Sequence, residues 1–140
     1  AGPQGVRRAA FSEVFDRTLK LNATEVLLQL CTPKAQTEAP WAFERRTRNA
    51  KIAYPLASVA ALKDGGRVRF ALSGVCDFPF RFWALEQCVN ESSEPLSEKL
   101  DLTPTLLPAE PRNDIDGSGE YRIALAKTLL ARVARKLEVG

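Results

Sequence analysis

The sequence predicts an α+β fold in which helices pack on one face of a small antiparallel sheet. Apolar and alternating segments fill residues 41–75, a glycine turn separates two of them, and the segments after residue 75 have helical patterns. Strands that come first and helices that follow are typical of this class. With 140 residues, 45% of them hydrophobic, the chain can bury one sizeable core.

A loose N-terminal extension is expected before this domain. We expect a short helix near Ser12 to Arg17 and a strand near Val26 to Thr32. Asn22 and Thr24 favour a turn ahead of that strand, because their short side chains bond nearby backbone groups.

Three segments predict the sheet. WAFERRTRN, which begins at Trp41, indicates a strand that leads into a basic turn, and YPLASVAALK is a buried element whose small residues also fit a helix. GRVRFALSGV alternates, with Val68, Phe70 and Leu72 on one face. Asp64-Gly65-Gly66 predicts a hairpin, since glycines accept the positive φ of tight turns, and this favours a strand for the middle segment.

Helical signals dominate after Val75. Asp77 and Pro79 predict a helix start, as a cap and a first-turn proline. Leu96 and Leu100 indicate a short helix, with three prolines limiting its extension. The expected apolar face of the first helix consists of Phe80, Trp83, Ala84 and Cys88.

The last helix is the clearest element and is predicted from about Ser118 to Leu137. Ser118 can cap it, and Glu120 complements the helix dipole in the first turn. Its expected apolar stripe consists of Tyr121, Leu125, Leu129 and Val133.

The composition narrows the function classes. Histidine is absent, which removes the commonest general base, and the three cysteines have no metal-type spacing, so we predict no catalytic and no metal-ligating residue. An odd number of cysteines, no signal peptide and no long apolar run lead us to expect a cytoplasmic chain outside the membrane. The net charge of +3 is scattered and does not indicate nucleic-acid binding.

The basic run Arg45 to Lys51, RRTRNAK, is the first candidate for binding. A solvated loop, a contact to an anion or dinucleotide, and a nucleic-acid contact all remain open for it. DGSGEYR has glycines at a helix start but lacks the lysine of a phosphate loop, so helix capping explains it. Six aromatic residues are interpreted as core or subunit-interface residues: Trp41, Phe43, Phe78, Phe80, Phe82 and Trp83.

Four segments resemble a known family. DGSGEYRIALAKTLLARVARKL is similar to the closing helix of the flavin-binding subunits of xanthine dehydrogenase, carbon monoxide dehydrogenase and related molybdenum hydroxylases. NATEVLLQLCTP, FERRTRNAKIAYPLASVAAL and VRFALSGVCDFPFR resemble three further pieces of these subunits, in the same order. The resemblance covers nearly the whole chain.

This resemblance implies how the chain is divided and what it works with. Residues 1–38 would be the tail of the FAD-binding domain, and residues 39–140 the C-terminal domain of the subunit. Most of the FAD would be held by an N-terminal part not included in the chain. Electrons would pass from iron-sulfur clusters, in a partner subunit beside the molybdenum-cofactor subunit, through FAD to NAD or another acceptor. The isolated chain is therefore not expected to be active.

The resemblance also implies a set of cofactor-binding residues. Leu27 falls at an apolar contact to the flavin, and the loop beside the flavin ring and the nicotinamide contains Glu44, Arg45, Arg48 and Asn49. Glu44 stands where many relatives carry lysine, and Lys51 where an acidic residue is common. The alternative reading of the chain is a docking or dimerisation module without redox chemistry.

Overall fold

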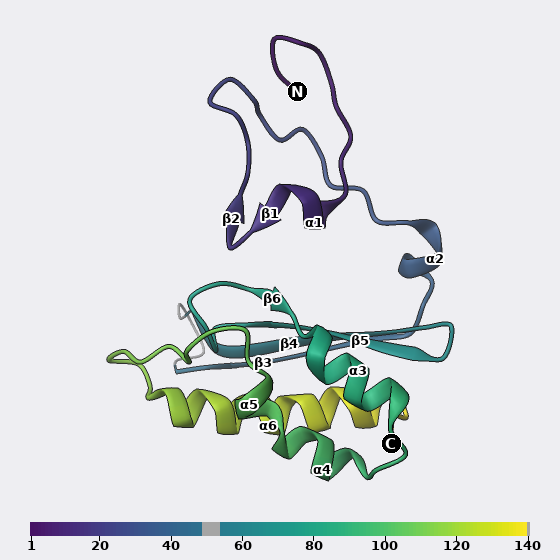
Figure 1. Cartoon of the computed structure of the whole chain (residues 1–140), viewed down its shortest axis with the longest axis vertical. Helices are drawn as coiled ribbons and strands as arrows, with labels where there is room; N and C mark the ends of the chain where they lie inside the picture. Colours follow the sequence, from purple (N-terminus) through teal and green to yellow (C-terminus); the bar gives the residue numbers. More distant parts are fainter. Residues whose placement is uncertain (49–53, 140) are drawn as a thin grey trace. The chain divides into compact units, whose positions relative to one another are not determined.

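The computed structural model describes residues 1–48 and 54–139. The chain forms two compact units, Ala1–Thr37 and Glu38–Gly140 (Figure 1). The predicted site residue Asn49, and Lys51 beside it, lie outside the described residues.

The N-terminal unit contains only short elements. Helix α1, Phe11–Val14, leads into the two-residue strands β1, Phe15–Asp16, and β2, Thr18–Leu19, and helix α2, Lys34–Thr37, ends the unit. The predicted helix over 12–17 is therefore wrong in its second half. The chain turns at Arg17, whose φ is 63°, and Asp16 pairs with Thr18 across this turn.

The predicted strand over 26–32 does not form. Residues 26–33 adopt no regular structure, and Val26, Leu28 and Leu30 are more than half exposed. A strand needs a neighbour that accepts and donates its backbone hydrogen bonds, and no described strand pairs with this segment. The run of apolar residues alone could not show that the neighbour would be missing.

The larger unit contains a four-stranded antiparallel sheet in the order β3-β4-β5-β6. Its strands are β3, Trp41–Thr47, β4, Pro55–Asp64, β5, Arg67–Ser73, and β6, Phe80–Arg81. Gly65 and Gly66 join β4 to β5 with φ values of 58° and 82°, so the predicted hairpin and the strand assignment of the middle segment are confirmed.

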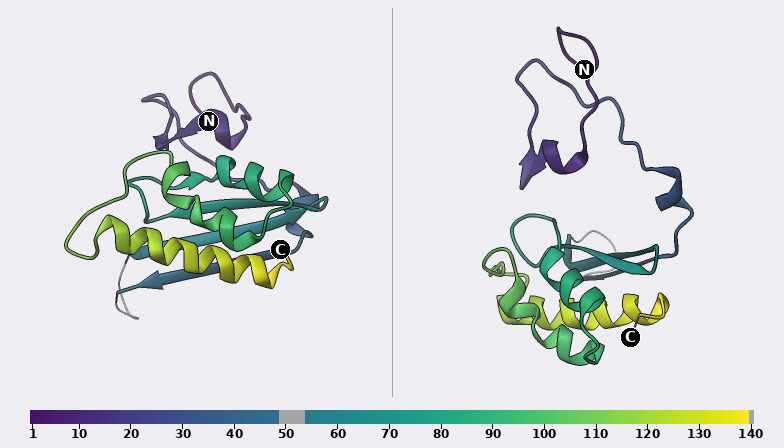
Figure 2. Two further views of the ribbon diagram at one scale, coloured as in Figure 1. Left: turned by 60° about the horizontal axis from the view of Figure 1, so that its bottom comes forward. Right: turned by 45° about the vertical axis from the view of Figure 1, so that its right-hand side comes forward.

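Helices cover one face of this sheet, as Figures 1 and 2 show. They are α3, Trp83–Glu91, α4, Leu96–Asp101, α5, Thr103–Leu106, and α6, Gly119–Lys136. Helix α6 packs on β3 and β4, and α3 packs on β5. The predicted α+β class, with helices on one face of a small antiparallel sheet, is confirmed.

The core lies between the sheet and these helices. Val68, Phe70 and Leu72 of β5 are buried, as their alternation predicts, and they meet Leu130 and Val133 of α6 in one apolar cluster. The predicted stripe of α6 is correct at Leu129 and Val133 but wrong at Tyr121, which is 48% exposed. The helix instead turns the next side chain, that of Arg122, inward.

Helix α3 begins later than the sequence predicts. Phe80 and Arg81 pair with Leu72 and Ala71 of β5, so their backbone is extended, and the helix starts at Trp83. This register shifts the buried face of α3 to Leu85 and Glu86. The sheet contact decides the helix start here, and a helical pattern cannot reveal it.

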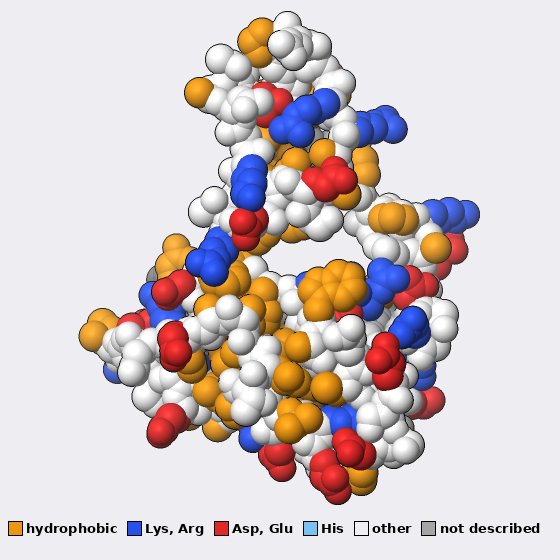
Figure 3. Space-filling view, in the orientation of Figure 1, with side chains coloured by type: hydrophobic (Ala, Val, Ile, Leu, Met, Phe, Trp, Pro, Cys, Tyr) orange, Lys and Arg blue, Asp and Glu red, His pale blue; other side chains and the backbone are white. Residues whose placement is uncertain are grey.

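Several aromatic side chains predicted for the core or an interface are exposed. Trp41, Phe43 and Trp83 are 69%, 48% and 59% exposed, whereas Phe82 is buried. In β3, Trp41 and Phe43 alternate with the buried Ala42, so they lie on the sheet face away from the helices. Figure 3 shows hydrophobic side chains reaching the molecular surface beside charged ones.

Side chains of α3 complete the edge of β5 where the short β6 does not reach. The Glu86 carboxylate accepts a hydrogen bond from the backbone N–H of Phe70 at 2.9 Å. One turn later, the Asn90 side chain accepts from the N–H of Val68 at 2.8 Å and donates to its carbonyl at 2.9 Å. The edge of the strand is thereby satisfied without another strand.

Removal of the Asn90 amide should therefore destabilise the fold. We expect Asn90→Ala to lower the free energy of unfolding by about 1–3 kcal/mol, because two partly buried backbone groups of Val68 lose their partner. Urea unfolding followed by circular dichroism measures this. Gln87→Ala, at an exposed position of the same helix, is the control and should change little. Equal effects of the two variants would contradict the proposed role of Asn90.

Candidate functional site

The candidate site lies at the end of the sheet where β3 and β5 finish and β4 begins. Gly74 follows β5 here with a φ of 81°. A Cβ atom at this position would lie 2.6 Å from the carbonyl oxygen of Pro55 and 2.9 Å from that of Leu56. Only glycine permits both the positive φ and this close approach of two backbones.

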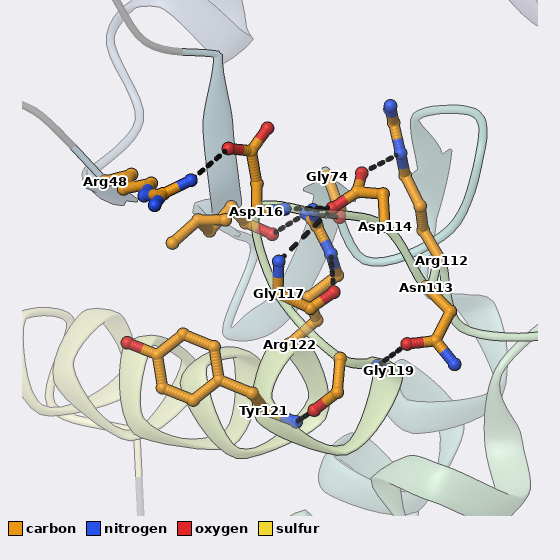
Figure 4. Close-up of polar contacts among 12 residues, drawn as sticks. Arg48, Gly74, Arg112, Asn113, Asp114, Asp116, Gly117, Gly119, Tyr121 and Arg122 are labelled. Carbon is orange, nitrogen blue, oxygen red and sulfur yellow. Dashed lines mark hydrogen bonds and ion pairs between the residues drawn. The ribbon is translucent and has the colours of Figure 1, made fainter.

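Arg122 fastens this end of the sheet to helix α6. The side chain is 3% exposed, and its Nη1 donates to the carbonyls of Leu56 at 2.9 Å and Gly74 at 2.8 Å (Figure 4). Its Nη2 donates to the Asp114 carboxylate at 2.7 Å. A buried guanidinium needs such a complete set of acceptors, and here it links β4, β5 and the turn that precedes α6.

The turn Asp114–Gly117 is built around one carboxylate. Asp114 Oδ1 accepts from the backbone N–H groups of Asp116 at 3.0 Å and Gly117 at 3.2 Å, besides Arg122. Arg112 Nε lies 2.6 Å from the other oxygen. The hydrogen bond from Arg122 holds the pKa of Asp114 below its usual range, so this carboxylate stays ionised at neutral pH.

The turn places Asp116 against the end of β3. Arg48 Nη1 donates to Asp116 Oδ1 at 3.1 Å, and the two side chains are 60% and 51% exposed (Figure 4). The predicted loop arginine is thus bonded to a residue 68 positions away in the sequence. Both groups remain accessible to a ligand from solvent.

The other described loop residues point to different faces of the sheet. Glu44 lies on the helix side, where its carboxylate accepts from Lys136 of α6 at 2.7 Å, and this hydrogen bond lowers the pKa of Glu44. Arg45, the next residue, is exposed on the opposite face. The structure therefore brings neither side chain to Arg48.

Leu27 belongs to the N-terminal unit, where it lines a cavity of about 430 Å³. The wall is mostly apolar, with Val6, Phe11 and Leu30 among its residues. Arg7 and Glu25 also line it and form an ion pair in which Arg7 Nε donates at 2.7 Å. An apolar wall of this kind fits a planar ring system better than a phosphate group.

The motif DGSGEYR, interpreted from the sequence as helix capping, ends at Arg122, whose hydrogen bonds beside β4 and β5 the sequence analysis did not predict. An arginine inside the apolar stripe of a helix is the signal that could have revealed them, because a buried charge requires partners. Within the described part of the chain, no group of three or more acidic or cysteine side chains could hold a metal ion. None of its helices has the length and apolar character needed to cross a bilayer.

Comparison with solved structures identifies the fold. The chain resembles carbon monoxide dehydrogenase from Hydrogenophaga pseudoflava, with 24% identity and a TM-score of 0.58, over 70% of this chain and 36% of that one. For reconstituted CO dehydrogenase from Oligotropha carboxidovorans the values are 21%, 0.59, 70% and 36%. Quinoline 2-oxidoreductase from Pseudomonas putida 86 gives 28%, 0.56, 71% and 37%.

These proteins are molybdenum hydroxylases, so the family resemblance predicted from the four segments is confirmed. The chain has the fold of one region of such oxidoreductases and spans a little over a third of the length of the chains it matches. No protein-family model and no curated protein sequence match it.

Arg122 offers a direct test of how this end of the sheet is held together. We expect Arg122→Met to lower the free energy of unfolding by at least about 2 kcal/mol, because the carbonyls of Leu56 and Gly74 lose their donor. Arg112→Met is the matched control, since Arg112 bonds the same carboxylate but is half exposed. Chemical denaturation of both variants should show a small loss for Arg112→Met. Similar losses would show that Arg122 acts only as a counter-ion of Asp114.

Proposed function

We propose that this chain is the C-terminal part of the FAD-binding subunit of a molybdenum hydroxylase similar to xanthine dehydrogenase. The fold shared with CO dehydrogenase and quinoline 2-oxidoreductase over 70% of the chain is the observation that carries this proposal. In it, residues 1–38 form the tail of the FAD-binding domain and residues 39–140 the C-terminal domain. The order of the four family-like segments supports the same division.

In this proposal FAD is held mainly by a preceding part of the subunit. The cofactor supplies reversible two-electron chemistry, and this chain shapes the surroundings of the ring. In the N-terminal unit, the apolar cavity lined by Leu27 suits a contact to the ring. In the larger unit, Arg45 and Arg48 provide positive charge. Glu44, which the proposal also places on the loop beside the ring, accepts a hydrogen bond from Lys136 of α6. Asn49 completes the proposed loop.

The proposed partners are a molybdenum-cofactor subunit and an iron-sulfur subunit in a cytoplasmic hetero-oligomer. Electrons from the iron-sulfur clusters reach FAD and leave to NAD or another acceptor. Arg48 is the residue best placed to attract such an acceptor if it is anionic, because its guanidinium is exposed at the end of the sheet.

The exposed face of the sheet motivates the alternative function, a docking module without redox chemistry. Trp41 and Phe43 lie there uncovered within the larger unit. Capture of a molybdenum or iron-sulfur subunit by the parent protein supports the flavin-subunit proposal. A stable partner that contains no cofactor supports the docking module.

Flavin titration tests the proposed division of the subunit. The isolated 140-residue chain should bind FAD weakly or not at all, whereas the complete subunit should be purified yellow. Isothermal titration calorimetry of the chain and the absorption spectrum of the subunit measure the two cases. Tight one-to-one binding by the chain alone would contradict the division.

Arg48→Ala in the complete enzyme tests the acceptor role. We expect the KM for an anionic acceptor to rise by about fivefold, the effect of losing one exposed charge contact worth about 1 kcal/mol. In rapid-reaction measurements, the rate at which the substrate reduces the enzyme should be the same for Arg48→Ala and the wild type. Arg67→Ala is the control, since Arg67 is also an exposed, ion-paired arginine but lies at the hairpin end of the sheet. A change confined to the rate of substrate oxidation would contradict the assignment of Arg48 to the acceptor site.

A further inference from the structure

We infer that Asp116 is a positioning residue for Arg48. Its carboxylate is an exchangeable counter-ion of the Arg48 guanidinium, at the end of the sheet where an anion would bind. An incoming diphosphate group of an acceptor displaces the Asp116 carboxylate from the guanidinium. This inference rests on the proposed function and deepens it, because it names the residue that tunes how strongly Arg48 binds an anion.

The position of Asp116 is fixed by buried contacts behind it. Its own N–H donates to Asp114, and Asp114 accepts from Arg122, which in turn bonds the carbonyls of β4 and β5. The carboxylate of Asp116 therefore projects from an anchored turn, as Figure 4 shows. Arg48, at the end of β3, meets it at 3.1 Å.

The two ion pairs differ in exposure: the pair of Arg122 with Asp114 is largely buried, and the pair of Arg48 with Asp116 is open to solvent. Arg122 and Asp114 are 3% and 22% exposed, whereas Arg48 and Asp116 are 60% and 51% exposed. Exposed pairs contribute only about 0–1 kcal/mol, so a ligand carrying two or more negative charges can replace one carboxylate. The buried pair lacks this freedom because its separation would leave charge without a partner.

The remaining donors of Arg48 suit such a ligand. A guanidinium has five N–H donors, and the hydrogen bond to Asp116 involves Nη1. Beside Asp116 in the chain, Ile115 is 93% exposed.

Inorganic pyrophosphate is the probe for this inference, with the full chain in solution at low salt. The Arg48 side-chain N–H signal in NMR titrations should report binding by the wild-type chain. We expect Asp116→Asn to tighten pyrophosphate binding by about two- to fivefold, the most that loss of one exposed pair can give. Asp116→Glu, which keeps the carboxylate, should restore wild-type affinity.

Asp101→Asn is the matched control, since Asp101 forms an exposed ion pair with Lys127 and its substitution changes the net charge equally. It should leave the Arg48 titration unchanged. In the Arg48→Ala background, which lacks the Arg48 signal, calorimetry with pyrophosphate is the readout. There Asp116→Asn should have no effect on pyrophosphate affinity, because the two residues act through one contact.

Three results would overturn the inference: equal affinities of the wild type and Asp116→Asn, an equal gain with Asp101→Asn, or no response of Arg48 to pyrophosphate. Failure of the proposed function is distinguishable from these. In that case pyrophosphate binds as expected while Arg48→Ala leaves the acceptor kinetics of the complete enzyme unchanged. This outcome would support the anion site and contradict its proposed role in binding the acceptor.

Discussion

The buried guanidinium of Arg122 is the contact on which the rest of the larger unit depends. It joins α6 to the ends of β4 and β5 and fixes the carboxylate of Asp114. Helix burial by apolar contact alone would leave α6 free to slide along the sheet, because hydrophobic contact has little direction. Hydrogen bonds to two named carbonyls remove that freedom and set where the turn before the helix must lie.

The features predicted correctly from the sequence depend on local chemistry. Ser118 caps α6 through the N–H of Tyr121, and Gly65 and Gly66 adopt the positive φ of the hairpin. The errors concern long-range pairing. The segment 26–32 contains a run of apolar residues but has no described strand beside it, and α3 starts late because Phe80 and Arg81 pair with β5. Neither fact is encoded within the segment itself.

The candidate site shows the same limit. The resemblance led to Arg48, and the structure shows this side chain exposed at the end of a strand. It could not lead to Asp116, because their contact joins residues far apart in the chain. It also grouped Glu44 with Arg45, although alternation along β3 sends neighbouring side chains to opposite faces. The division of a strand into two faces follows only when its register is known.

The side chains that α3 offers to β5 also bear on how the protein avoids aggregation. Glu86 and Asn90 occupy backbone groups that would otherwise recruit a strand from another molecule. In the described part of the chain, β3 is then the only strand of the four-stranded sheet longer than two residues with an unpaired edge. Its run of charged residues, Glu44 to Arg46, opposes the stacking of identical copies, since like charges would face one another along a growing fibre.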